Sequence, residues 1–91
     1  MPESNENRRP KGKGEGRDGG DEYFIYDRSK DEVHVLNATA RDIYLFCDGS
    51  RTPEQIAAAM AEKYGVDVAT ARRDTELALH ELSELGVLGW D

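Results

Sequence analysis

Cysteine and long hydrophobic runs are both scarce in this sequence. The single cysteine, Cys47, has no second thiol with which to form an internal disulfide. No apolar stretch reaches the length that a signal peptide or a membrane span requires. Together these absences predict a soluble protein of the reducing cytoplasm that is held together by packing rather than by covalent links.

Basic charge is scarce outside the first 20 residues. The whole chain carries 12 Lys and Arg against 19 Asp and Glu, for a net charge of −7. Five of the basic residues but only four of the acidic ones fall in residues 1–20, so residues 21–91 have a net charge of −8. A folded part this acidic repels nucleic-acid phosphates and favours basic or neutral partners.

The first 20 residues are also poor in hydrophobic side chains. Glycine and charged residues dominate the segment, and Met1 is its one strand- or helix-forming apolar residue. Such a segment buries too little surface to offset the entropy lost on ordering, so the sequence predicts a disordered tail through Gly20. Residues 21–91 suffice for one small domain.

This domain is expected to consist of a β-hairpin followed by three helices. Residues 21–27 and 32–36 are typical of strands, and a short polar loop joins them. Helix caps, stops and apolar spacing predict helices at residues 38–47, 53–64 and 68–85. The order predicts a small α+β domain of winged-helix outline, with a hairpin or three strands at its N-terminus. That outline serves DNA binding and peptide binding alike.

The second strand offers a first candidate binding surface. Along it Val33 and Val35 point to one side, and His34 and Leu36 point to the other. If the strand lies at the edge of its sheet, its unpaired backbone groups can take up an added peptide strand. In the alternative, the N-terminal tail or Trp90 covers this edge.

Leu77 marks a second candidate surface, on the third helix. At 100° per residue it lies far from the apolar stripe around Thr75, Leu79 and Leu82. Its neighbours on that side are polar: Thr70, Arg73, Asp74, His80, Glu81 and Glu84. Leu77 therefore either lines a groove or is an isolated exposed leucine of the common kind.

Other chemistry has little support in the sequence. Arg72 and Arg73 would suit contacts to DNA, but the acidic residues on the same helix oppose such contacts. His34, His80 and Cys47 lie too far apart in the chain to make a good zinc motif. No phosphate-binding loop and no catalytic constellation is evident, so the sequence predicts no enzyme activity, no metal and no cofactor.

One longer pattern resembles a known family. Residues 33–49 read V-x-V-L-N-x-T-A-x-x-I-x-x-x-C-D-G, and residues 52–56 follow as TPEQI. This pattern resembles the PqqD family of RiPP recognition elements, with a resemblance that runs from about Tyr23 to Leu88. Many members carry an extra N-terminal strand, and here the equivalent region is the glycine-rich tail.

The resemblance implies a peptide chaperone without catalytic activity. Such proteins bind the leader of a ribosomally made precursor peptide and present it to a modifying enzyme, often a radical-SAM enzyme, in pyrroloquinoline quinone (PQQ) or other RiPP biosynthesis. The leader adds as an antiparallel strand between the last strand and the last helix. Carried onto this chain, the peptide-binding residues are Val33, His34, Val35, Leu36, Arg73, Asp74, Leu77, His80 and Glu81.

Two alternatives stay open at this point. One is a winged-helix regulator that binds DNA, for which affinity would fall steeply with added salt. The other is a subunit that docks on a larger enzyme without changing that enzyme's affinity for the leader.

Overall fold

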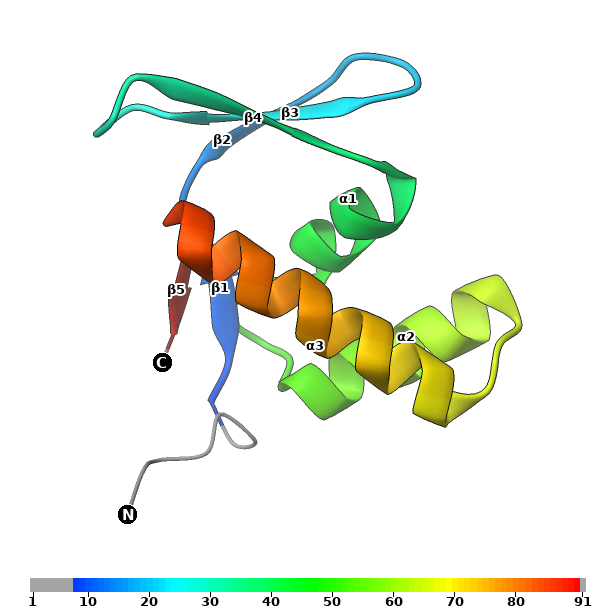
Figure 1. Ribbon diagram of the computed structural model, residues 1–91. Coiled ribbons are helices and arrows are strands. Elements are labelled where there is room, and N and C mark those ends of the chain that lie inside the picture. Colours follow the sequence, from blue (N-terminus) through cyan, green and yellow to red (C-terminus); the bar gives the residue numbers. More distant parts are fainter. Residues whose placement is uncertain (1–7, 91) are drawn as a thin grey trace.

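The structure, a computed structural model, describes residues 8–90 (Figure 1). Five short strands and three helices follow one another along this part of the chain. In order they are β1 (Pro10–Gly12), β2 (Glu15–Asp18), β3 (Tyr23–Asp27), β4 (Glu32–Leu36), α1 (Ala38–Phe46), α2 (Pro53–Tyr64), α3 (Val68–Leu85) and β5 (Leu88–Trp90). The α+β class and the order of hairpin and helices are as the sequence predicts.

The larger sheet is an antiparallel meander in the order β2-β3-β4. Ile25 of β3 pairs with Gly16 on one side and with His34 on the other. Ile25 and Leu36 are buried, whereas Val33 and Val35 are 59% and 52% exposed. The predicted alternation along β4 is therefore confirmed, with the two valines on the solvent side.

The smaller sheet joins the two ends of the described chain. β1 and β5 pair antiparallel, with Pro10 opposite Trp90. The Trp90 indole N–H donates a hydrogen bond of 3.0 Å to the Ser83 hydroxyl on α3. Trp90 therefore packs beside β1 and α3, and of the two possibilities for the β4 edge the one in which Trp90 covers it is wrong.

The N-terminal segment departs most from the prediction. The sequence predicts disorder through Gly20, but β1 and β2 both lie within this segment. Backbone pairing holds both strands, and in β1 the buried Pro10 ring adds to it, whereas β2 buries no side chain. A Cβ atom on Gly12 would lie 2.7 Å from the Tyr44 ring, so glycine here allows close packing. The sheet thus has three strands, and the predicted disorder of residues 1–7 concerns residues outside the described range.

The predicted helix caps are confirmed. The Asn37 side chain accepts from the Ala40 N–H at 2.8 Å, and Thr52 and Gln55 form the capping box of α2. Gly86 ends α3 in the left-handed conformation, with Val87 N–H donating to the Leu82 carbonyl as in a Schellman motif.

The core lies where α1 packs between the larger sheet and the other two helices (Figure 1). Its fully buried side chains come from all three layers. The largest are Ile25, Ile43, Ile56, Leu82 and Val87. Val68, which the helical spacing assigns to the buried stripe of α3, is exposed because it lies in the first turn, beyond the end of the core. None of the helices in residues 8–90 has the length and hydrophobicity needed to cross a membrane.

Candidate functional site

The outer edge of β4 is open within the described chain. β4 pairs with β3 along its whole length, and no other strand of residues 8–90 pairs with it. In an antiparallel strand, alternate residues direct their N–H and C=O groups to the side away from the existing partner. β4 therefore presents a row of backbone donors and acceptors to which an extended peptide can bond.

The opposite edge of the sheet, formed by β2, is a poorer receptor. β2 reads EGRD and is exposed at every position. Glu15 already forms an ion pair of 2.7 Å with Arg28, and charged side chains on an edge strand discourage further pairing. β4 instead carries two exposed valines, Val33 and Val35, which offer apolar surface to a bound chain.

Leu77 provides further apolar surface on α3. It is 56% exposed, whereas Leu79 and Leu82 of the same helix are buried. This placement is the one predicted from the helical spacing. The other predicted α3 residues are exposed with it: Arg73, Asp74, His80 and Glu81.

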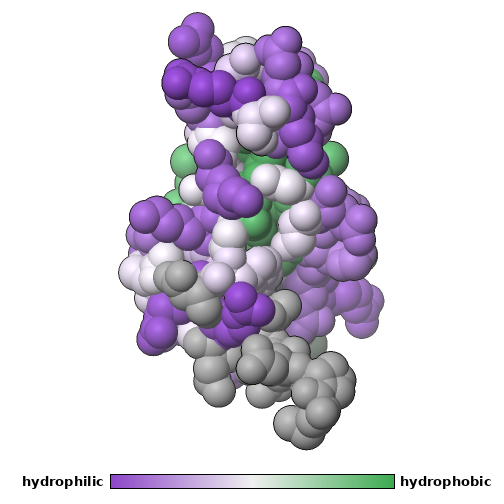
Figure 2. Space-filling model, turned by 90° about the vertical axis from the view of Figure 1, so that its left-hand side faces the viewer, coloured by the Kyte–Doolittle hydropathy of each residue, from purple (hydrophilic) through white to green (hydrophobic). Residues whose placement is uncertain are grey.

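The two candidate surfaces are connected by α1. α1 contacts both β4 and α3, and so connects the sheet to the helical part of the molecule. Figure 2 shows hydrophobic atoms at the waist where these parts meet, between a hydrophilic upper end and a hydrophilic lower end. The sheet and the helices thus meet at an apolar junction on this side of the molecule (Figure 2).

Of the predicted β4 residues, two have side chains directed inward. Leu36 is a core residue, so only its backbone can meet a peptide at the edge. The His34 side chain is 15% exposed, and its Nε2 atom has no hydrogen-bond partner. Its nearest charged neighbour is the Glu32 carboxylate at 3.8 Å, which is too far for a hydrogen bond.

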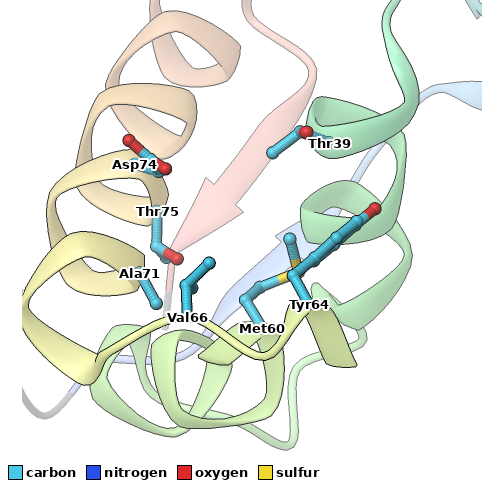
Figure 3. Close-up of a pocket in the computed structure, with 7 residues that line it drawn as sticks. All are labelled: Thr39, Met60, Tyr64, Val66, Ala71, Asp74 and Thr75. Carbon is cyan, nitrogen blue, oxygen red and sulfur yellow. The ribbon is translucent and has the colours of Figure 1, made fainter. Parts of the chain in front are cut away.

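A small cavity of about 220 Å³ opens where all three helices meet (Figure 3). Its walls come from the start of α1, the end of α2, the α2–α3 connection and the first half of α3. The lining residues are Thr39, Met60, Tyr64, Val66, Ala71, Asp74 and Thr75. Of these only Asp74 is a predicted site residue. The sequence placed Thr75 in the buried stripe, and no local signal indicated a cavity, because its walls are distant in the chain.

Tyr64, one wall of this cavity, is held by a buried carboxylate. Its hydroxyl donates to Asp42, which is 4% exposed and also contacts Arg41 at 3.2 Å and Lys63 at 3.5 Å. Burial on its own would raise the pKa of Asp42. The hydrogen bonds from Tyr64 and Arg41 and the two positive charges outweigh burial and lower this pKa below its usual value. Asp42 is therefore ionised at neutral pH and ties α1 to α2.

The described residues give little support to catalytic, metal or DNA chemistry. Burial raises the pKa of Cys47 to about 12, so its thiol is protonated and unreactive at neutral pH. Residues 8–90 contain no cluster of three or more His, Cys, Asp or Glu that could hold a metal ion. Arg72 forms an ion pair of 3.3 Å with Glu54 of α2, which occupies a cation that DNA would need.

Comparison with known proteins places this geometry in context. Residues 22–88 match the family described as coenzyme PQQ synthesis protein D (PqqD). The solved structure of TbiB1 in complex with the TbiA(beta) leader peptide superposes with a TM-score of 0.72 at 24% sequence identity. This match covers 84% of the present chain and 93% of the TbiB1 chain, and at that identity it shows a shared fold. A search of curated proteins gave no match.

Proposed function

The chain belongs to the PqqD family, and from this premise we propose that it binds the leader segment of a ribosomally made precursor peptide. The leader adds to the open edge of β4 as an antiparallel strand. The observation that carries the proposal is this edge, with Val33 and Val35 exposed beside it and Leu77 exposed on α3.

Strand addition assigns a separate role to each part of the site. Backbone hydrogen bonds along β4 supply affinity with little dependence on sequence. The exposed side chains of Val33, Val35 and Leu77 select apolar residues of the peptide. Arg73, Asp74, His80 and Glu81 border Leu77 and act on the charges of the peptide.

TbiB1 supports the binding of a leader peptide, because it has the same fold and was solved in complex with one. The acidic charge of residues 21–91 also favours a basic or neutral ligand over nucleic acid. No observation in the described residues favours the DNA-binding alternative.

The bound leader is then presented to a modifying enzyme, for which the family resemblance indicates a radical-SAM enzyme of PQQ or another RiPP pathway. In this proposal the chain itself has no catalytic role, and it works in the cytoplasm without a cofactor. The buried, protonated Cys47 thiol is consistent with a role in binding alone.

A matched pair of leucine variants tests the site. The probe is a short peptide selected from a displayed random-sequence library on the wild-type chain. Leu77→Asp should weaken its binding at least about tenfold, because it replaces apolar contact area with a charge. Leu45→Asp is the control, since Leu45 is 55% exposed on α1 but lies outside the proposed site.

Fluorescence anisotropy gives both affinities, and circular dichroism checks that helix content is unchanged. If the two variants bind the peptide equally well, Leu77 is not part of the site. If no peptide can be selected on the folded chain, the binding proposal itself is contradicted.

A further inference from the structure

The cavity between the three helices has the size of a single side chain. Its volume of about 220 Å³ lies below the roughly 300 Å³ at which pockets for drug-sized ligands begin. Met60 and Ala71 are buried in its walls, and Val66, which is 42% exposed, also lines it (Figure 3). The cavity can therefore accept an aliphatic stem but not a large cofactor.

Two polar groups of the cavity, on Thr75 and Asp74, are free to accept from a donor. Thr75 is 1% exposed, and its hydroxyl has no hydrogen-bond partner in the described chain. Asp74 is exposed and forms no ion pair within residues 8–90. None of the seven lining residues is basic. The cavity thus has an unpaired carboxylate and an unpaired hydroxyl, both able to accept hydrogen bonds, and its lining has no positive charge to balance the carboxylate.

Nearby cations are engaged elsewhere or lie outside the lining. Arg41 and Lys63 both contact Asp42, behind the Tyr64 hydroxyl. Arg72 pairs with Glu54 on the outer side of α2. Arg73 adjoins Asp74 in sequence but is not among the lining residues. The carboxylate of Asp74 is therefore available to a ligand.

We propose that this cavity binds the side chain of an arginine or a lysine. The methylene stem packs on Met60 and Val66, as long basic side chains commonly do on apolar surfaces. The head group donates to the Asp74 carboxylate and to the Thr75 hydroxyl, two neighbouring residues of α3 that both line the cavity. Arginine fits better than lysine because its planar group has five donors and can stack on the Tyr64 ring.

The position of the cavity indicates which part of a leader supplies this residue; this step rests on the proposed function. β4 ends at Leu36, three residues before Thr39 in the cavity wall. A strand added antiparallel to β4 begins at this end and runs toward Glu32. The basic residue therefore lies on the N-terminal side of the segment that pairs with β4.

A small probe tests the cavity without any peptide. The probe is N-acetyl-L-arginine N-methylamide, titrated into the isotope-labelled full-length chain and followed by NMR. The expected result is a set of saturable shifts at Thr39, Val66, Ala71 and Thr75. The norleucine analogue, which has a similar stem but no charge, should give weaker shifts.

Variants of Asp74 and Thr75 measure how much each polar group contributes to binding of the arginine probe. Asp74→Asn should weaken binding of the arginine probe by about two- to fivefold, as expected for an ion pair at an exposed position. Thr75→Val, which keeps the shape and removes the hydroxyl, should also weaken it. Glu76→Gln is the control, because Glu76 is exposed on α3 but does not line the cavity.

Three results would overturn the proposal: no shifts at the cavity up to the solubility limit of the probe, equal binding of the norleucine analogue, or equal effects of Asp74→Asn and Glu76→Gln. The probe cannot pair as a strand, so its binding is independent of the β4 edge. Cavity binding without strand addition would contradict the proposed function alone, and strand addition without cavity binding would contradict this inference alone.

Discussion

Asp42 and Thr75, two of the three buried polar residues in the described chain, differ in whether their polar groups have hydrogen-bond partners. Asp42 has three partners, Tyr64, Arg41 and Lys63, and contributes to stability as a charge. Thr75 has none for its hydroxyl, although it is more deeply buried. An unpaired buried hydroxyl costs free energy, so a side chain that serves only the fold would be apolar at this position.

Thr75→Val should therefore stabilise the chain. Valine has almost the same shape and removes a buried hydroxyl without a partner, so the free energy of unfolding should rise by about 1 kcal/mol. Urea denaturation measures this change, with the exposed Thr39→Val as control. A loss of stability in Thr75→Val would show that the hydroxyl has a structural partner.

Because of Asp42, the stability of the chain should fall at low pH. Its pKa is lowered in the folded state, so its contribution is fully present above the unfolded pKa near 4 and is lost as pH falls through the folded value. Thermal unfolding from about pH 7 down to about pH 2 should show this loss in the wild type and a flatter dependence in Asp42→Asn. Equal slopes in both proteins would contradict the assignment.

The variant Tyr64→Phe tests one of the hydrogen bonds to Asp42. It removes the hydrogen bond to Asp42 but keeps the ring that lines the cavity. The free energy of unfolding at neutral pH should fall by about 1–2 kcal/mol, since the bond is charge-assisted and partly exposed. A change within error would mean that Arg41 and Lys63 hold Asp42 without Tyr64.

For single residues, the sequence predicts which way a side chain points better than it predicts which residues that side chain contacts. The period of a strand or helix sets which way Val33, Val35 and Leu77 point, and the structure confirms all three. The partners of Asp42 could not be predicted in the same way, because Tyr64 lies 22 residues away and local spacing does not report on such a contact.

At the scale of elements, the helices were predictable and the N-terminal strands were not. Each helix has capping residues next to it in the sequence, such as the capping box of Thr52 and Gln55. β1 and β2 have no such signal, because they consist of one proline, two glycines and charged residues that form strands only against β5 and β3. Composition therefore predicted disorder where tertiary pairing produces strands.

Gly12 shows how closely β1 approaches the core. A Cβ atom there would lie 2.7 Å from the Tyr44 ring, and the Tyr44 hydroxyl also accepts from the Gly14 N–H at 3.1 Å. Gly12→Val should lower the free energy of unfolding by about 1–3 kcal/mol through overpacking. Lys11→Val, on the exposed side of β1, is the control, and equal stability of the two variants would show that Tyr44 moves aside without cost.

At the scale of the whole molecule, the two ends of the described chain stabilise each other. β1 pairs with β5, and β2 completes the sheet that carries β4. A domain of this size has a small core, so the loss of two strands is a large fraction of its stability.

Deletion of residues 1–20, the segment that composition predicts to be disordered, should therefore lower the melting temperature markedly. The deletion removes both β1 and β2 and leaves β5 and one side of β3 without partners. Deletion of residues 1–7 is the matched control, because it stops short of β1. Equal melting temperatures for the two truncated chains would show that β1 and β2 add nothing to the fold.

Strand addition at β4 can be observed in a single NMR experiment. The isotope-labelled chain is mixed with a peptide selected from the random-sequence library, and its amide hydrogen exchange and contacts with the peptide are recorded. Strand addition should protect those β4 amides that point away from β3, and Hα atoms of the peptide should lie close to Hα atoms of β4 in antiparallel register. Protection at the edge of β2, or binding that leaves the β4 amides exchanging as before, would contradict it.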